Sequence, residues 1–248
     1  ILAIAAVVLL AAGLWKRDEI MRLWAVNSLF AEDRIVANFP NMEGAFLTRP
    51  VSRGAGPVVP LATGDGMPLP AGAGDWVPAR AVTSLLVLKD GKIRHESYHL
   101  GTAETDRRIS WSVAKSYLSA LFGILLKEGA IASLDDPVTT YAPLLTGSAY
   151  DGASCRNVVN RASGVTVDED YLDYDSDINR MGREIALGGA LDPFAADLKD
   201  RFAAPGSTWQ YVSIDTHVIG MVIRGSPGRS IPAHLPAKIT TPPRLAPA

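Results

Sequence analysis

Residues 110–117, with the sequence SWSVAKSY, constrain this chain most because they join a serine and a lysine to an apolar run. Residues 118–126 are rich in alanine and leucine, contain no proline and are soon followed by Gly129. This pattern predicts a buried helix that ends at a glycine. Ser112 and Lys115 are three residues apart, so they share one face of its first turn.

A hydroxyl beside an ammonium at the N-terminus of a helix suits a nucleophile. The lysine can accept or relay the serine proton, and the helix dipole favours the negative charge that develops on the substrate oxygen. The pattern Ser-x-x-Lys also arises by chance in many proteins, so the motif alone is only a hypothesis. The residues around Ser112 decide how much weight it carries.

Residues 108–115, with the sequence RISWSVAK, resemble the entry to the nucleophile helix of serine β-lactamase-related hydrolases. The similarity is closest to the branch of class C β-lactamases, esterases and 6-aminohexanoate-dimer hydrolases. It implies an α/β (α+β) fold of the β-lactamase/transpeptidase type, with an antiparallel sheet flanked by helices. It also implies that an amide or ester is hydrolysed through an acyl-enzyme on Ser112, a 6-aminohexanoate-oligomer-type amide being one option.

A second motif, PGSTWQYVS, lies at residues 205–213, and the apolar residues 214–224 after it predict a buried helix. In the resembled family a Pro-Gly turn leads to Tyr-x-Asn or Tyr-x-Ser. Tyr211 matches that tyrosine and Ser213 the third position. The resemblance gives Tyr211 a share, with Lys115, in the acid and base steps, and Ser213 a place in substrate binding. Without the first motif, Tyr211 would be more typical of a half-buried core tyrosine.

Two further segments fit the family order. Residues 81–88 and 93–100 predict two strands, and residues 89–92 between them predict a hairpin turn. In the family, such a hairpin precedes the nucleophile helix. Residues 168–177 are acidic and aromatic, which fits a solvated loop and a substrate-facing loop about equally. Tyr171 in this loop is a weak candidate for substrate binding.

The end of the chain departs from the family pattern. These hydrolases carry a third motif, Lys-Thr-Gly or His-x-Gly, on a later strand that supplies an oxyanion-hole amide. Residues 232–248 are rich in proline instead. We therefore expect a partial hydrolase domain over residues 76–231, truncated at its C-terminus, and an atypical tail over 232–248 with little or no hydrolysis by the chain. The alternative is an inactive, membrane-anchored protein of this fold that binds without turnover.

The N-terminal segment forms a separate element. Residues 1–15 are apolar, which is shorter than the roughly 20 residues that span a bilayer. A signal peptide and an uncleaved anchor both fit residues 1–17, and the lack of a clean cleavage site favours the anchor. Lys16 and Arg17 follow the apolar run, which is unusual for an exported protein. We expect a cell-envelope location, either membrane-anchored or periplasmic or secreted.

Residues 18–75 predict a helix at 18–30, followed by a linker rich in proline and glycine at 38–75. The formal net charge of −2 gives no reason to expect nucleic acid as a partner. The single cysteine, Cys155, is best explained as a small buried hydrophobe. The four histidines lack the spacing of paired metal ligands, so we expect no metal, no cofactor, and a small-molecule amide or ester as substrate.

Overall fold

The computed structural model describes residues 10–11, 13–53, 57, 60–226 and 230–240. Two compact units are present, and each is described by itself. The hairpin unit comprises Ser28–Met42 and Pro57–Ile109. The helical unit comprises Ile1–Asn27, Glu43–Gly56 and Ser110–Ala248. A short 3-10 turn, η1 (Met42–Gly44), joins residues of both.

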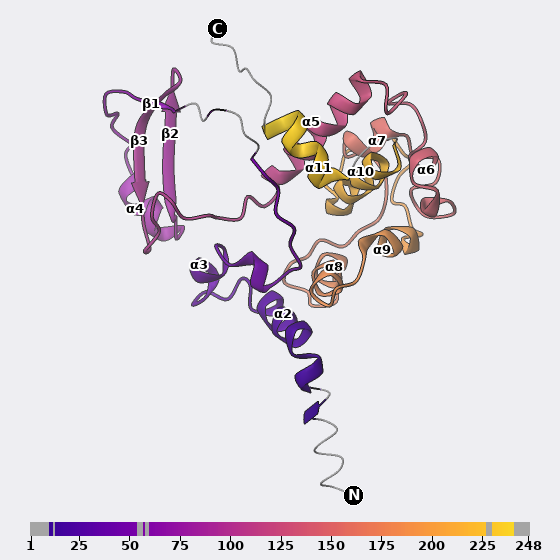
Figure 1. Cartoon of the computed structure of the whole chain (residues 1–248), viewed down its shortest axis with the longest axis horizontal. Coiled ribbons are helices and arrows are strands. Elements are labelled where there is room, and N and C mark those ends of the chain that lie inside the picture. Colours follow the sequence, from indigo (N-terminus) through magenta and orange to yellow (C-terminus); the bar gives the residue numbers. More distant parts are fainter. Residues whose placement is uncertain (1–9, 12, 54–56, 58–59, 227–229, 241–248) are drawn as a thin grey trace, which may run out of the picture. The chain divides into compact units, whose positions relative to one another are not determined.

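The hairpin unit contains a small sheet in the strand order β1-β3-β2 (Figure 1). Strands β2 (Ser84–Lys89) and β3 (Lys92–Tyr98) are antiparallel, and the short β1 (Ala62–Thr63) adds a parallel edge to β3. Asp90 and Gly91 have φ values of 55° and 70°, as a two-residue type I′ turn requires. The predicted hairpin is therefore confirmed.

Two short helices complete the described structure of the hairpin unit. They are α3 (Ile35–Asn38) and α4 (Ala73–Ala79). Arg108 donates a hydrogen bond of 2.6 Å to the carbonyl oxygen of Val36, which ties α3 to the end of the unit. The predicted linker at 38–75 contains the turn η1 and the short strand β1.

Helix α5 (Val113–Lys127) is the predicted nucleophile helix. Gly129 follows it with a φ of 77°, a conformation that glycine adopts without a steric penalty. The predicted burial holds for its C-terminal half, where Leu121 and Leu125 are buried. The first turns lie before the predicted apolar run and are more exposed: Val113 is 62% exposed, and Lys115 and Ser116 line a pocket.

Helix α10 (Ser213–Gly225) lies at the centre of the helical unit and confirms the predicted buried helix. It packs against α5 and three shorter helices, as Figure 1 shows: α6 (Val138–Tyr141), α7 (Cys155–Val159) and α9 (Leu191–Asp197). A Cβ atom on Gly225 would lie 1.7 Å from the carbonyl oxygen of Tyr141, so only glycine permits the contact with α6. Cys155 is free and fully buried, as predicted.

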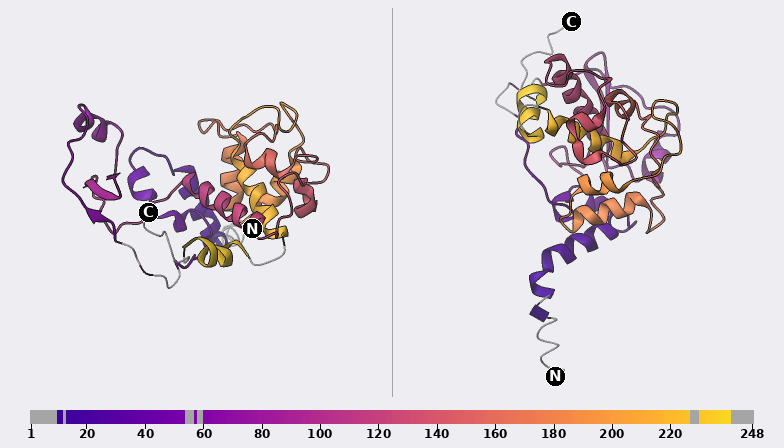
Figure 2. Two further views of the ribbon diagram at one scale, coloured as in Figure 1. Left: turned by 90° about the horizontal axis from the view of Figure 1, so that it is seen from above. Right: turned by 90° about the vertical axis from the view of Figure 1, so that its right-hand side faces the viewer.

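Helix α2 (Arg17–Asn27) confirms the helix expected at 18–30, although it ends three residues earlier. It packs along α8 (Asp177–Ala186), as Figure 2 shows. Arg22 donates a hydrogen bond of 2.7 Å to the carbonyl oxygen of Ala186 in this contact. Among the described residues, no helix has both the length and the apolar character needed to cross a membrane. Most of the predicted anchor, residues 1–9 and 12, lies outside them.

The remaining elements are short. They are η2 (Pro143–Leu145), α11 (Ile231–Leu235) and η3, a π-helical turn (Pro236–Thr240). The described part of the proline-rich tail is therefore helical, with a proline in the first turn of α11, where no amide is needed for an intrahelical bond. Part of this tail, residues 241–248, lies outside the described residues.

Candidate active site

A pocket of about 380 Å³ in the helical unit contains all three predicted catalytic side chains, Ser112, Lys115 and Tyr211. Ser112 is the N-cap residue of α5, Lys115 lies in the first turn of α5, and Tyr211 lies two positions before α10. The volume lies in the range of sites for small molecules. The other residues that line the pocket are Ser116, Ser119, Val159 and Arg161.

The Ser112 hydroxyl is directed at Tyr211. Ser112 is the residue before α5, but its side chain makes no capping hydrogen bond, so the hydroxyl is not engaged with the helix. Its Oγ lies 2.8 Å from the phenol oxygen of Tyr211, a distance at which either group can donate. Trp111 just before it has a φ of 44°, an unfavourable conformation for a bulky residue that is found mostly at functional positions.

Lys115 places its ammonium over the ring of Tyr211, with Nζ 5.9 Å from the ring centroid. This arrangement brings a positive charge close to the phenol that faces Ser112. A cation near the ring stabilises negative charge on the phenol oxygen. The most direct path for the Ser112 proton therefore runs to Tyr211, with Lys115 beside it.

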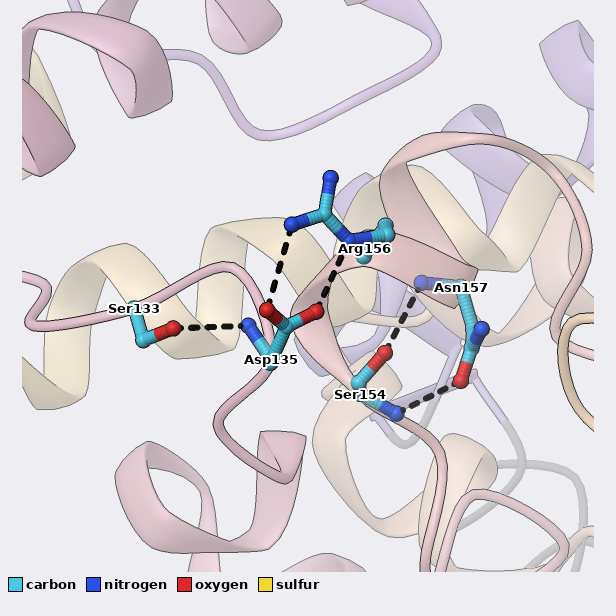
Figure 3. Close-up of polar contacts among 5 residues, drawn as sticks. All are labelled: Ser133, Asp135, Ser154, Arg156 and Asn157. Carbon is cyan, nitrogen blue, oxygen red and sulfur yellow. Dashed lines mark hydrogen bonds and ion pairs between the residues drawn. The ribbon is translucent and has the colours of Figure 1, made fainter.

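Arg161 is a pocket residue that the sequence analysis missed. It follows α7, whose start is fixed by a reciprocal capping box between Ser154 and Asn157, with hydrogen bonds of 3.2 and 2.9 Å (Figure 3). The Arg161 guanidinium lies 5.4 Å from the centroid of the Tyr211 ring. Arg161 lies in none of the motifs of the sequence, so no local pattern marked it.

Ser213 is close to the site but is engaged with another residue. Its backbone N–H donates to Glu169 Oε1, and its hydroxyl donates to Glu169 Oε2 at 3.1 Å. Because its one hydrogen is donated to Glu169, the Ser213 hydroxyl can act toward a substrate only as a hydrogen-bond acceptor. Its role in substrate binding remains a prediction.

Tyr171 belongs to the acidic loop that carries Glu169. Partial burial raises the pKa of Tyr171, and the Glu169 and Tyr211 charges add to the rise, whereas a hydrogen bond with Ser213 opposes it. The loop therefore lies beside the Tyr211 segment, and Tyr171 is 53% exposed there. This placement fits the predicted contact with substrate, which no observation tests.

A buried polar pair supports the start of α10. The Tyr150 hydroxyl donates a hydrogen bond of 2.8 Å to Asp215 Oδ1, and both side chains are fully buried. Burial raises the pKa of Asp215 to about 6, although the hydrogen bond from Tyr150 and the charge of Arg161 oppose the rise. Sequence analysis missed this pair because an aspartate in an apolar helix gives no sign of its partner.

Among solved structures, the chain is similar to a protein from Bacillus anthracis provisionally assigned as a 6-aminohexanoate-dimer hydrolase. The TM-score is 0.70 at 15% identity, over 86% of this chain and 60% of that one. The similarity confirms the expected fold class.

A curated relative is the 6-aminohexanoate-dimer hydrolase of Paenarthrobacter ureafaciens, which is 32% identical over 145 residues. The match covers 56% of this chain and 37% of the relative, so the chain spans well under half of that protein. A family model described as Beta-lactamase matches residues 77–247, which is more than half of the chain. Together with the pocket, this match shows that the chain belongs to the β-lactamase family.

Proposed function

We propose that this protein is a serine hydrolase that cleaves an amide or ester through an acyl-enzyme on Ser112. The single observation that carries the proposal is the distance of 2.8 Å between Ser112 Oγ and the Tyr211 phenol oxygen. A nucleophile within hydrogen-bond reach of a base, beside an oriented third group, is the geometry that acyl transfer requires. Lys115 is that third group.

In the acylation step, Tyr211 acts as the general base and takes the proton from Ser112 Oγ. Ser112 Oγ then forms a bond to the carbonyl carbon of the substrate, and the π electrons of that carbonyl move onto its own oxygen. Collapse of this tetrahedral intermediate breaks the bond to the leaving group, which departs with the proton from Tyr211. Water then attacks the acyl-enzyme by the same steps: it gives a proton to Tyr211 and forms a bond to the acyl carbon. Collapse of this second intermediate releases the carboxylic acid and returns the proton to Ser112.

The charge in the pocket supports this assignment of roles. Lys115 and Arg161 place two cations around the Tyr211 ring, at 5.9 and 5.4 Å from its centroid. Both stabilise the phenolate that accepts the proton. The positive end of the α5 dipole also lies at Ser112, next to which the oxyanion develops on the substrate carbonyl oxygen.

The substrate class is proposed as a small linear amide or ester, with a 6-aminohexanoate oligomer as the leading amide. The name of the Paenarthrobacter relative supports the amide. The pocket volume of about 380 Å³ supports a small molecule rather than a folded partner.

The test is intact-mass spectrometry of the full chain after brief exposure to 4-nitrophenyl butyrate or to the 6-aminohexanoate dimer. A single acyl adduct on the peptide that contains Ser112 is expected, and Ser112→Ala should not form it. One turnover suffices for this readout, so slow hydrolysis does not hide it. Absence of both an adduct and any hydrolysis of either compound would contradict the proposal and favour an inactive binding protein of this fold.

A further inference from the structure

We propose that Arg161 and Glu169 are positioning residues that hold Tyr211 against Ser112 by binding the peptide group between Val212 and Ser213, one residue after Tyr211. The inference rests on the proposed function and adds two residues to it. Both act through Tyr211 rather than on the substrate.

Arg161 contacts the chain on both sides of Tyr211. Its Nη1 donates to the carbonyl oxygen of Val212 at 2.8 Å, and its Nη2 donates to Thr216 Oγ1 at 2.6 Å. Its own carbonyl oxygen accepts a hydrogen bond of 2.8 Å from the backbone N–H of Gln210. The residue before Tyr211 and the residue after it are therefore tied to one arginine.

Glu169 holds the other end of the same peptide group. The Val212 carbonyl belongs to the peptide whose N–H is that of Ser213, and this N–H donates to Glu169. The Ser213 hydroxyl adds a second bond to the same carboxylate at 3.1 Å. Because a peptide group is planar and rigid, binding its C=O and its N–H fixes the orientation of the Val212–Ser213 peptide. Together with the hydrogen bond from Gln210 to Arg161, this holds the backbone on both sides of Tyr211.

A structural explanation accounts for Glu169 fully and for Arg161 in part, because the Arg161 charge also acts on the buried carboxyl of Asp215. Val212, the N-cap residue of α10, makes no side-chain capping bond, so a carboxylate there supplies the missing acceptor and suits the helix dipole. A cation at the same end of a helix is unfavourable. Arg161 also has a φ of 58°, a costly conformation for a non-glycine residue.

The position of Arg161 also serves Tyr211. The guanidinium lies 5.4 Å from the ring centroid, inside the pocket that contains Ser112. There it stabilises the phenolate that takes the Ser112 proton, while its two donors hold the backbone. Glu169 compensates the charge from the opposite side of the peptide group. The pair thus fixes the place of the base.

Matched variants separate this role from simple loss of stability. Arg161→Met and Glu169→Ala remove the hydrogen bonds to the Val212–Ser213 peptide group, whereas Arg161→Lys keeps a donor and Glu169→Gln keeps an acceptor. Thr216→Val removes only one acceptor of Arg161. The control is Arg156→Met on α7, because Arg156 pairs with the exposed Asp135 through bonds of 2.8 and 3.2 Å and does not line the pocket (Figure 3).

The measurements are the rate at which a fluorophosphonate labels Ser112, and kcat and KM for 4-nitrophenyl butyrate, with thermal melting as the check on folding. We expect Arg161→Met and Glu169→Ala to lower the labelling rate and kcat by about 10²-fold, the cost of a misplaced reacting group, with KM little changed. The two conservative variants should recover most of the rate, Thr216→Val should lose several-fold, and Arg156→Met should match the wild type.

The outcomes distinguish the two claims. If the wild-type chain is not labelled at Ser112, the proposed function fails and the inference fails with it. If the wild type is labelled and the folded Arg161→Met and Glu169→Ala variants react as fast, only the positioning role is wrong. If either of these variants does not fold, Arg161→Lys, Glu169→Gln and Thr216→Val decide: graded losses that follow the number of bonds removed support the role, and wild-type rates in all three overturn it.

Discussion

The Ser112 hydroxyl oxygen lies 2.8 Å from the Tyr211 phenol oxygen, although 99 residues separate them in the chain. Helix α5 begins directly after Ser112, and the segment before α10 brings Tyr211 to this contact. The motifs at residues 110–117 and 205–213 are each weak evidence alone, but their residues line the same pocket. This relationship gives the proposed chemistry its base and its nucleophile.

Replacing Tyr211 with phenylalanine removes the group that accepts the Ser112 proton. We expect Tyr211→Phe to lower kcat for a nitrophenyl ester by about 10²–10⁴-fold, the usual contribution of a positioned acid or base. The melting temperature should change little because Tyr211 is 39% exposed. Tyr117→Phe is the control, since Tyr117 lies on the same helix α5, is exposed, and does not line the pocket. Equal rates for the two variants would remove Tyr211 from the mechanism.

Lys115 and Tyr211 should act as one unit. Lys115→Met is expected to lower kcat by an amount similar to that of Tyr211→Phe, and the double variant should lose no more than the worse single variant. Lys127→Met in the exposed last turn of α5 provides the control. Losses that multiply in the double variant would mean that the two residues serve separate steps.

The stability of the protein should depend on Asp215. Burial raises its pKa from 3.8 to about 6, so between these values the folded state holds a proton that the unfolded state has released. The free energy of unfolding therefore falls as pH rises through this window and levels off above it. The contribution is on the order of 3 kcal/mol at most.

Urea unfolding of the wild type and of Asp215→Asn at several pH values from 4 to 7 measures this contribution. The stability of the wild type relative to the variant should decline between pH 4 and 6. His217, whose pKa burial lowers, is common to both proteins and cancels in the difference. Asp197→Asn, at an exposed site on α9, should follow the wild type. A pH-independent difference between wild type and Asp215→Asn would show that Asp215 does not titrate in this range.

The sequence predicted those features that depend on local patterns. The hairpin followed from two strand-like runs around Asp90 and Gly91, both of which have positive φ. Helix α5 followed from an apolar run that ends before Gly129. The grouping of Ser112, Lys115 and Tyr211 followed from family resemblance, because nothing local links residues so far apart.

The residues that support the site could not be predicted in this way. Arg161 and Glu169 contact the Tyr211 segment through their side chains, and their partners lie 51 and 44 residues away in the sequence. Their neighbours in sequence carry no periodic pattern that points to this segment. Asp215 was likewise missed, because its partner Tyr150 lies 65 residues away. Such contacts depend on tertiary packing, which one sequence does not reveal.

We also propose a cell-envelope location, based on the apolar residues 1–15. After expression in a bacterium, the chain should sediment with membranes and resist a carbonate wash, while a variant that lacks residues 1–15 should be released. Marker proteins of the cytoplasm and the inner membrane calibrate the fractions. An uncleaved chain found entirely in the cytosolic fraction would argue against this location.

The identity of the nucleophile is the central claim, and covalent labelling tests it most directly. A fluorophosphonate should modify the wild-type chain at one residue, and peptide mapping by mass spectrometry should place the modification on Ser112. Ser116→Ala, which changes another serine of the pocket, should label as the wild type does, whereas Ser112→Ala should not label. Undiminished labelling of Ser112→Ala, or modification mapped to another residue in the wild type, would contradict the account.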